Sequence, residues 1–273
     1  MMLPFTYLFV PGNRPERFVK AQAAGAGAII LDLEDAVAPD SKAAARDEIA
    51  RWCSSQNDAA NIVLRINDRQ SPWFADDLAL LRDSRIRLVM LPKTESADDV
   101  VAVLAALPQD GEVLPLIETA RGVRRVEEIA AAAGVQRIVF GTIDYALDMN
   151  LSGDERGLIY PASQIALASR CAGIAAPVAG VTLAIDDEAV LLADLAFARA
   201  FGFGAKLCIH PRQVVATERA MAPTEKEIDW AQRVVAAVAM VSSVQGAVQV
   251  DGKMVDKPVL LQAEGILARA GRR

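Results

Sequence analysis

The segment Ala28-Ile29-Ile30-Leu31-Asp32-Leu33-Glu34-Asp35 joins a short, branched apolar run to a cluster of acidic residues. Five other short apolar runs lead in the same way to charged or amide residues, namely Arg65 with Asn67, Lys93, Glu118, Asp144 and His210. Short runs rich in branched residues are typical of strands that are buried on both faces. Polar residues at the same end of parallel strands gather on one face of the fold, where the chemistry of a parallel barrel is usually located.

Strand and helix patterns alternate along residues 1–222. The expected strands cover residues 7–10, 29–33, 62–66, 87–91, 113–117, 137–140, 177–181 and 205–209. The expected helices cover residues 15–24, 41–52, 73–81, 97–107, 124–133, 163–172, 187–201 and 210–220. Such alternation favours a parallel sheet, and eight units favour closure into a (β/α)8 TIM barrel over an open, doubly wound sheet. No G-x-G-x-x-G motif follows the first expected strand, which weakens the dinucleotide-binding alternative.

Residues 223–273 break this rhythm and predict a C-terminal helix–hairpin–helix extension. Thr224 and Glu227 have the spacing of a capping box at the start of a helix that runs to about Val241. Residues 248–255 predict a hairpin that turns at Asp251-Gly252, and a last helix is expected over residues 258–270. Because the barrel is already complete, we expect this extension to dock on a neighbouring subunit.

Composition and charge exclude several classes of protein. The 273-residue chain is 53% hydrophobic and carries a net charge of −6, and it has no basic stripe interleaved with aromatic residues, so nucleic-acid binding is not expected. The longest apolar run, residues 234–241, is far too short to span a bilayer. Met1-Met2-Leu3-Pro4 lacks the charged region and cleavage site of a signal peptide. The sequence therefore predicts a globular protein that is not bound to a membrane.

The three cysteines also bear on location. Cys53, Cys171 and Cys208 do not have the spacing of metal ligands. We expect all three to be reduced and buried. Reduced cysteines are typical of cytosolic proteins, so a cytoplasmic location is expected.

Glu118 and Asp144 follow two consecutive expected strands. Carboxylates at neighbouring strand ends lie close together, and such a pair requires a cation or a shared proton between the two groups. Oxygen ligands without a nearby thiolate or imidazole suit Mg²⁺. Alternatively, each carboxylate caps the following helix or pairs with Arg121 or Arg124.

Arg65 ends the third expected strand, where its guanidinium can clamp a carboxylate or stabilise an enolate oxygen. Alternatively it forms a structural salt bridge with Asp32 or Glu34, and the two interpretations are compatible. Asp32, Glu34 and Asp35 are three acids within four residues, so we expect at least one of them to bind Arg65 or a metal-bound water. Each is expected to support the residues that contact substrate rather than to contact substrate itself.

Four further residues are candidates for which a structural interpretation is also available. Arg14 and Arg17 flank the start of a helix and could bind phosphate, although solvated surface arginines fit the pattern equally well. His210, the only histidine, could act as a general base, but a structural role is favoured. Asp256 precedes a helical proline by two residues, which is typical of a helix cap.

Several of these segments together resemble the citrate lyase β-subunit family. This is the branch of the HpcH/HpaI aldolase superfamily that contains malyl-CoA and citramalyl-CoA lyases. The matching segments are residues 7–17, 31–37, 65–67, 91–93, 117–122, 208–211 and 254–259. Their order and spacing extend the resemblance over nearly the whole chain.

The resemblance implies a (β/α)8 barrel, assembly as a trimer or a dimer of trimers, and Mg²⁺-dependent carbon–carbon cleavage of an acyl thioester. Glu118 and Asp144 match the metal ligands of the family. Arg65 matches an arginine that binds the oxygens of the keto acid or enolate. Asp256 matches a carboxylate that the tail of a neighbouring chain brings over the site. The resemblance therefore implies that Asp256 combines helix capping with a catalytic role.

Two other positions are implied less directly by the resemblance. Arg14 falls where the family contacts the substrate or its CoA portion, and Lys93 lies at the same mouth of the barrel. Around the second ligand the family commonly has Gly-Ala-Glu-Asp-Leu, whereas this chain has Gly141-Thr142-Ile143-Asp144-Tyr145 and loses an acid. Residues 180–183 also depart from the lyases. Both departures concern the shape of the pocket and the substrate preference.

The sequence therefore predicts a lyase that cleaves a 3-hydroxyacyl thioester, such as malyl-, citramalyl- or citryl-CoA, with Arg65 and Asp256 as catalytic residues. One alternative is the β subunit of a citrate lyase complex, which acts on a citryl group borne by an acyl carrier. Another is a pyruvate-type aldolase acting on a free hydroxy-keto acid. This last interpretation is less favoured, because such relatives use a histidine earlier in the barrel and this chain has only His210.

Overall fold

The computed structural model describes residues 3–56, 61–240 and 248–271. Met1, Met2 and the expected helix end at Val241 lie outside these residues. The chain separates into two compact units, Met1–Glu218 and Arg219–Arg273. The sequence prediction places the boundary four residues later, between residues 222 and 223. Each unit is described by itself below.

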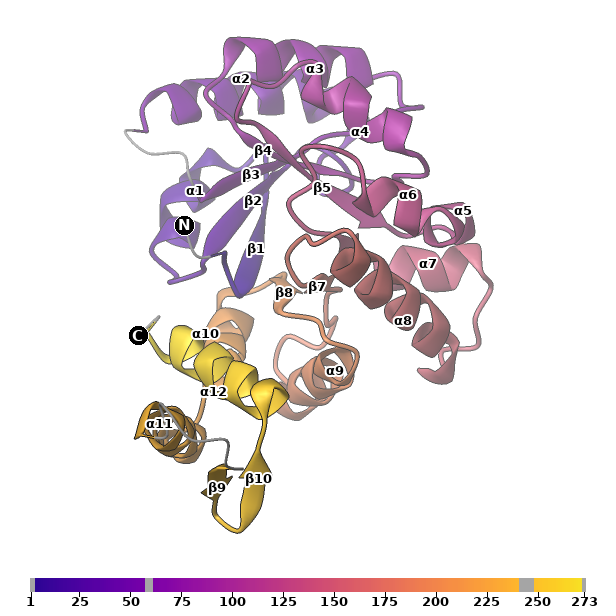
Figure 1. Ribbon diagram of the computed structural model, residues 1–273. Helices are drawn as coiled ribbons and strands as arrows, with labels where there is room; N and C mark the ends of the chain where they lie inside the picture. The colour runs from indigo at the N-terminus through magenta and orange to yellow at the C-terminus, as the bar shows by residue number, and fades with distance from the viewer. Residues whose placement is uncertain (1–2, 57–60, 241–247, 272–273) are drawn as a thin grey trace. The chain divides into compact units, whose positions relative to one another are not determined.

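The first unit is a closed barrel of eight parallel strands in sequential order, in which β8 pairs with β1 (Figure 1). The strands are β1 (Thr6–Pro11), β2 (Ala28–Asp32), β3 (Ile62–Arg65), β4 (Leu88–Leu91), β5 (Glu112–Ile117), β6 (Val139–Phe140), β7 (Val178–Ala179) and β8 (Ala205–Cys208). All eight expected strands are present, although β6 and β7 are shorter than expected. The predicted (β/α)8 barrel is thus confirmed.

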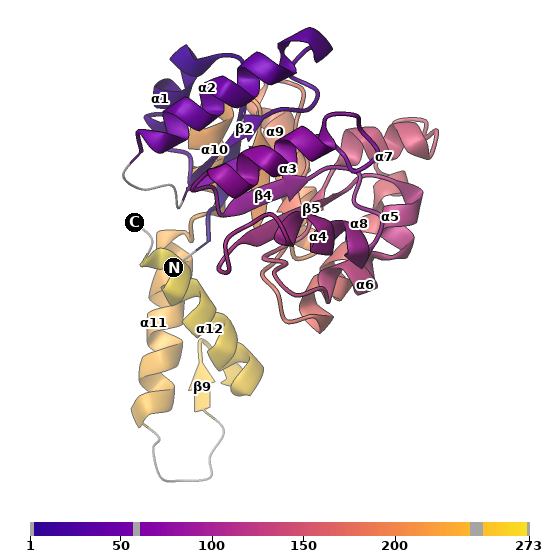
Figure 2. The ribbon, with the colours of Figure 1, turned by 90° about the horizontal axis from the view of Figure 1, so that it is seen from above.

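Helices cover the outside of this barrel (Figure 2). They are α1 (Pro15–Gln22), the 3-10 helix η1 (Pro39–Ser41), α2 (Lys42–Ser54), α3 (Phe74–Asp83), α4 (Ala97–Leu104), α5 (Ala120–Arg124), α6 (Val126–Ala130), α7 (Thr142–Asp148), α8 (Arg156–Cys171), α9 (Glu188–Ala200) and α10 (Pro211–Met221), which crosses the boundary between the units. A large apolar cluster fills the layer between strands and helices, and a smaller one fills the barrel interior.

The alternation of side chains along each strand determines which polar residues face the barrel interior. The interior residues of β2, β3 and β5 include Ile30, Val63 and Leu116. Because side chains alternate with a period of two, the residues two positions further along face the same way. These residues are Asp32, Arg65 and Glu118, all at the carboxyl ends of their strands. The alternation therefore brings one arginine and two acids to the same mouth of the barrel.

The helices after β5 and β6 differ from the expectation. A single helix was expected over residues 124–133, but Thr119 caps the earlier helix α5 by accepting a hydrogen bond from the Gly122 N–H, and the chain leaves helical geometry at Arg125 before α6. Helix α7 was not expected at all. Asp144 consequently lies in the first turn of a helix and not at a strand end, a position that favours a carboxylate.

Two other expectations are corrected. Helix α8 starts at Arg156, seven residues before the expected position, and Pro161 lies inside it. The prediction started the helix too late because a proline removes one N–H donor, yet this helix tolerates the loss near its beginning. Cys171, the last residue of α8, is exposed, whereas Cys53 and Cys208 are buried as expected.

The second unit contains α11 (Glu225–Met240), the two-stranded sheet of β9 (Val248–Val250) and β10 (Lys253–Val255), and α12 (Lys257–Ala270). Thr224 and Glu227 form the expected capping box, with reciprocal hydrogen bonds of 3.2 and 2.7 Å. The hairpin turns at Asp251-Gly252, where both residues have a positive φ. Its core includes Ala231, Val234, Ala263 and Ile266. The predicted helix–hairpin–helix is confirmed.

Within the described part of the chain, no helix combines the length and the apolar character that crossing a bilayer requires.

Candidate active site

Arg65 is held in place by a fully buried carboxylate. Asp32 in β2 lies opposite Arg65 in β3 in the strand register. The Arg65 Nε and Nη2 atoms donate hydrogen bonds of 2.7 and 2.6 Å to the two oxygens of Asp32. The same carboxylate accepts hydrogen bonds from the backbone N–H groups of Glu34 and Ala36. Asp32 therefore fixes the plane of the guanidinium through a bidentate pair.

Glu34 bridges the two cations at this mouth of the barrel. Its Oε2 lies 2.9 Å from Arg65 Nη1, and its Oε1 accepts a 2.8 Å hydrogen bond from Lys93 Nζ. Burial raises the pKa of Glu34, although Arg65 and Lys93 oppose this shift. The exposed Asp35 lies 3.6 Å from Arg65. The expected salt bridge of Arg65 is thus present, and its closest contacts are to Asp32 and Glu34.

Lys93 connects this cluster to Glu118. Its φ of 47° is in the left-handed region, which is costly for a residue with a Cβ and occurs often at functional sites. In this conformation its backbone N–H donates a 2.8 Å hydrogen bond to Glu118 Oε1, while its Nζ binds Glu34. Burial lowers the pKa of Lys93, but the hydrogen bond to Glu34 and the nearby acids outweigh that effect and raise it.

Glu118 and Asp144 face the same cavity. Glu118 is 3% exposed, and burial together with the charges of Glu34 and Asp144 raises its pKa to about 8. The Lys93 N–H and the Arg65 charge oppose this increase. Asp144 lies in the first turn of α7. A buried carboxylate with two other acids nearby provides an energetic reason for a cation or a proton at this position.

The cavity has a volume of about 400 Å³. It is lined by Phe9, Asp32, Asp35, Ala36, Arg65, Leu116, Glu118, Gly141, Thr142, Ile143, Asp144, Val181, Leu183, Leu207 and Ile209. Its titratable lining consists of four carboxylates and one arginine, without a thiol or an imidazole, which is a donor set for a hard divalent cation. In the described ranges no cluster of three or more potential metal-binding acids, histidines or cysteines is found. The protein can thus supply two carboxylates, Glu118 and Asp144, and would leave other coordination positions to water and substrate.

Gly141 keeps the carboxylate of Glu118 accessible. A Cβ at residue 141 would lie 2.6 Å from Glu118 Oε2 and 2.7 Å from Glu118 Cβ. The absence of a side chain at Gly141 therefore preserves the space in front of this carboxylate.

We expect Gly141→Ala to lower the affinity for a divalent cation at least tenfold, because the new methyl group displaces the Glu118 carboxylate. Isothermal titration with Mg²⁺ measures this change. Gly265→Ala is the control, because a Cβ at that position in α12 has no atom closer than 3.8 Å. Equal Mg²⁺ affinity in Gly141→Ala and the unmodified protein would contradict this role of Gly141.

A buried network that the sequence analysis did not identify supports the cluster. Lys42 Nζ donates hydrogen bonds of 2.7 to 2.9 Å to the backbone oxygens of Leu33 and Glu34 and to Asn67 Oδ1. The fully buried Asp77 accepts hydrogen bonds from the backbone and the side chain of Asn67. The sequence places Asn67 at the end of the third expected strand but indicates no partner for it. Lys42 has no sequence signal, because it reads as an ordinary lysine at a helix start.

Arg14 and His210 are not among the residues that line this cavity. Arg14 is exposed and precedes α1. His210 Nδ1 accepts a hydrogen bond from the backbone N–H of Arg212, in agreement with a structural role. Asp256 belongs to the second unit, is exposed and caps α12 by accepting a hydrogen bond from the Val259 N–H.

Glu118 neither caps the following helix nor pairs with Arg121. Arg121 pairs with Glu95, and Thr119 caps the following helix. Glu118 instead directs its carboxylate to Lys93 N–H and the cavity.

Comparisons of the sequence and of the structure with known proteins agree on one family. The family model HpcH/HpaI aldolase/citrate lyase matches residues 6–211. A citrate lyase subunit beta-like protein of Mycobacterium tuberculosis is 39% identical over 97% of this chain and 95% of its own length. A (3S)-malyl-CoA thioesterase of Cereibacter sphaeroides is 35% identical over 98% of this chain and 95% of its own length.

A crystal structure of protein CitE from M. tuberculosis in complex with magnesium, acetoacetate and coenzyme A has a similar fold. It superposes with a TM-score of 0.84 at 37% identity and covers 98% of both chains. The sequence matches and this structural similarity extend over the whole barrel and the C-terminal extension. The chain therefore belongs to the HpcH/HpaI aldolase/citrate lyase family, a family of lyases and aldolases.

Proposed function

We propose that this protein is a Mg²⁺-dependent lyase that cleaves a 3-hydroxyacyl thioester to a 2-oxo acid and an acyl thioester. The observation that carries the proposal is the convergence of Glu118, Asp144 and Arg65 on one cavity. The M. tuberculosis protein crystallised with magnesium, acetoacetate and coenzyme A supports both the metal and a thioester substrate. The name of the C. sphaeroides relative, a malyl-CoA thioesterase, also supports a malyl-type thioester.

Glu118 and Asp144 would hold the Mg²⁺ ion. Their oxygens fit this ion, and Gly141 leaves the space beside Glu118 Oε2 open. When bound, Mg²⁺ would supply Lewis-acid polarisation of the substrate hydroxyl oxygen, which becomes the keto oxygen. The two carboxylates also orient the hydroxy-acid half of the substrate in the cavity.

Arg65 would bind the thioester oxygen on which negative charge develops. A base takes the proton of the substrate hydroxyl group, whose oxygen becomes the keto oxygen, and breakage of the carbon–carbon bond leaves its electron pair on the thioester fragment as an enolate. The bidentate pair with Asp32 and the contact with Glu34 fix Arg65 before the reaction starts. Loss of one such preorganised donor costs about 10²–10³ in rate.

Asp256 would supply the proton to the enolate carbon, from the tail of a neighbouring subunit in a trimer or hexamer. Asparagine caps helices about as well as aspartate, but it cannot donate this proton. We therefore expect Asp256→Asn to retain the thermal stability of the protein and to lose most of its turnover.

The matched variant Asp256→Ala separates the two roles, because it also removes the hydrogen bond to the Val259 N–H and should cost about 1 kcal/mol of stability. Chemical unfolding and steady-state kinetics are measured on both variants. Full turnover in Asp256→Asn would restrict this residue to capping.

A coupled 2-oxo acid assay with malyl-, citramalyl-, methylmalyl- and citryl-CoA tests the proposed function, first with Mg²⁺ and then with a chelator. Release of glyoxylate, pyruvate or oxaloacetate only with Mg²⁺ supports the proposal and identifies the keto-acid half. Release of free CoA without a 2-oxo acid would indicate thioester hydrolysis alone. Activity only on a carrier-bound citryl group would indicate a citrate lyase β subunit, and activity on a free hydroxy-keto acid would indicate an aldolase.

A further inference from the structure

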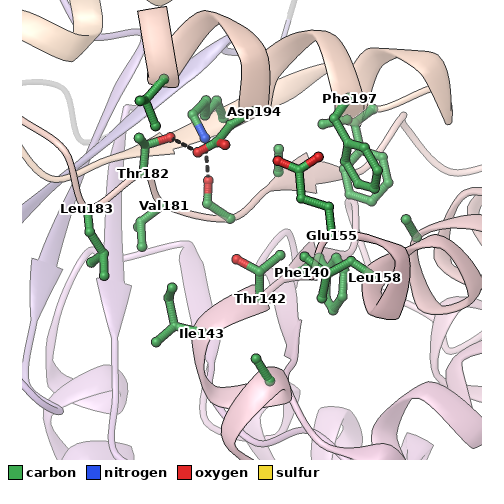
Figure 3. Close-up of a pocket in the computed structure, with 18 of the residues that line it drawn as sticks. Phe140, Thr142, Ile143, Glu155, Leu158, Val181, Thr182, Leu183, Asp194 and Phe197 are labelled. Carbon is green, nitrogen blue, oxygen red and sulfur yellow. Dashed lines mark hydrogen bonds between the residues drawn. The ribbon is translucent and has the colours of Figure 1, made fainter. Parts of the chain in front are cut away.

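A second cavity, of about 340 Å³, lies beside the candidate active site. Four residues line both cavities, namely Thr142, Ile143, Val181 and Leu183. Figure 3 shows these side chains along one side of the second cavity, with Phe197 on the far side. Thr142 and Ile143 directly precede the candidate metal ligand Asp144 in α7. The second cavity therefore lies next to the position proposed for the hydroxyl-bearing carbon of the substrate, which becomes the keto carbon.

Most residues that line this cavity are apolar, and they include Leu158 and the buried Phe140 and Ala162. Its interior space exceeds what a single aromatic ring needs, because a cavity of about 150 Å³ already holds benzene. The cavity thus has room for an aryl group or a branched alkyl chain.

The charged groups of the lining disfavour an anion. Asp154, Glu155 and Asp194 contribute three carboxylates, whereas Lys206 is the one cation among the described lining residues. Lys206 is 2% exposed, and its Nζ donates a 2.8 Å hydrogen bond to the backbone oxygen of Gly180. Asp194 accepts a hydrogen bond from the Thr182 hydroxyl (Figure 3). A second substrate carboxylate would therefore meet net negative charge and a lysine that is already engaged.

We propose that this second cavity binds an uncharged alkyl or aryl side chain on the 2-oxo acid half of the substrate. The inference rests on the proposed function, because it places the carbon that becomes the keto carbon beside Glu118 and Asp144. That carbon bears a hydroxyl group, a carboxylate, the chain to the thioester and one further substituent. This further substituent passes Ile143 and Val181 into the second cavity. The preferred substrate thus differs from a citryl thioester, whose corresponding substituent carries a carboxylate.

Isothermal titration of the full-length protein with 2-oxo acids in the presence of Mg²⁺ tests this inference. Affinity is expected to rise about fourfold for each methylene from pyruvate through 2-oxobutanoate to 2-oxopentanoate, because burial of one methylene contributes about that factor. Phenylpyruvate is expected to bind at least tenfold more tightly than pyruvate, and oxaloacetate no more tightly than pyruvate. An affinity that does not increase with chain length, or a preference for oxaloacetate, overturns the inference.

Two variants that reduce the volume of the second cavity test whether the increase in affinity with chain length arises there. Ala162→Leu fills it from α8, and Val190→Phe fills it from its open side, where Val190 is 41% exposed and a larger side chain cannot strain the core. Each variant is expected to bind 2-oxopentanoate at least tenfold more weakly. Ala196→Leu, at an exposed position of α9 outside the lining, is the control and should retain the affinity of the unmodified protein.

The outcomes separate the two proposals. If pyruvate binds with Mg²⁺ but neither filling variant changes the chain-length dependence, the second cavity is not the side-chain site and the proposed lyase function stands. If neither pyruvate nor any other 2-oxo acid binds, the proposed function fails and this inference fails with it. Thermal unfolding of all variants shows whether each one is folded, and Val190→Phe remains informative if Ala162→Leu does not fold.

Discussion

Glu118→Gln is expected to stabilise the metal-free protein at pH 9 while abolishing both the stabilisation by Mg²⁺ and the lyase activity. The pKa of Glu118 is raised from 4.5 to about 8, first by burial and then by the charges of Glu34 and Asp144. A group whose pKa is higher in the folded state contributes stability below its unfolded pKa, and this contribution is lost as the pH rises through the folded value. The unmodified protein therefore loses this contribution between about pH 4.5 and pH 8, whereas the glutamine variant has no such contribution to lose.

The size of this effect follows from the raised pKa of Glu118. Each tenfold change in a protonation equilibrium corresponds to about 1.4 kcal/mol, so the free energy of unfolding of the variant at pH 9 should exceed that of the unmodified metal-free protein by about 3–5 kcal/mol. At pH 4 the two proteins should be equally stable. Urea unfolding at both pH values measures the difference. Glu127→Gln, at an exposed position of α6, controls for the loss of one negative charge.

Mg²⁺ should stabilise the unmodified protein but not Glu118→Gln, and should therefore reduce the difference between them. Glu118 must be deprotonated to bind a metal ion. The Mg²⁺ affinity of the unmodified protein should therefore rise about tenfold for each increase of one pH unit, up to about pH 8. At a concentration of 100 times its Kd, Mg²⁺ stabilises the protein by about 2.7 kcal/mol. This gain should be absent in Glu118→Gln and intact in Glu127→Gln. Equal stabilisation of both variants by Mg²⁺ would exclude Glu118 as a ligand.

The core of the candidate site could be predicted from the sequence because the period of a strand is short and regular. Asp32, Arg65 and Glu118 each follow an inward-facing apolar residue by two positions, so a parallel barrel alone is enough to bring them together. The alternation of eight short apolar runs with helical segments was enough to predict the barrel. The register of β2 and β3 then accounts for the ion pair between Asp32 and Arg65.

Features that depend on tertiary contacts could not be predicted in this way. Helix α7 is short and was not expected, so Asp144 was placed at a strand end. Lys42 is buried because backbone oxygens after β2 and the side chain of Asn67 surround its ammonium group, and none of these contacts is local in sequence. The second cavity is formed by residues from α7, α8, α9 and the segment after β7, and no periodic pattern joins them.

Asp32→Asn is expected to destabilise the protein by about 3–5 kcal/mol, because it breaks a buried ion pair and leaves the Arg65 guanidinium with Glu34 as its closest remaining acid. Asp32 is fully buried and accepts four hydrogen bonds, two from Arg65 and two from backbone N–H groups. An amide of the same shape offers one acceptor and one donor group, so its NH₂ would face an N–H donor at one of these positions. The loss should appear in the free energy of unfolding measured with urea.

Asp35→Asn is the matched control for this variant. Asp35 lies 3.6 Å from the same guanidinium, but its side chain is 67% exposed. An exposed pair of this kind contributes at most about 1 kcal/mol, so Asp35→Asn should have little effect on stability. Comparable losses in the two variants would show that the number of charges near Arg65, rather than the buried contact with Asp32, determines the stability.

A double-mutant cycle with Arg65→Met separates the pair from the rest of the cluster. If the cost of Asp32→Asn arises mainly from the guanidinium that loses this partner, then the same substitution in an Arg65→Met background should cost several-fold less, because no buried positive charge remains to lose its partner. An unchanged cost in that background would assign the main role of Asp32 to the backbone N–H groups of Glu34 and Ala36. In that case Asp32 would shape the loop after β2, and the orientation of Arg65 would depend on Glu34 instead.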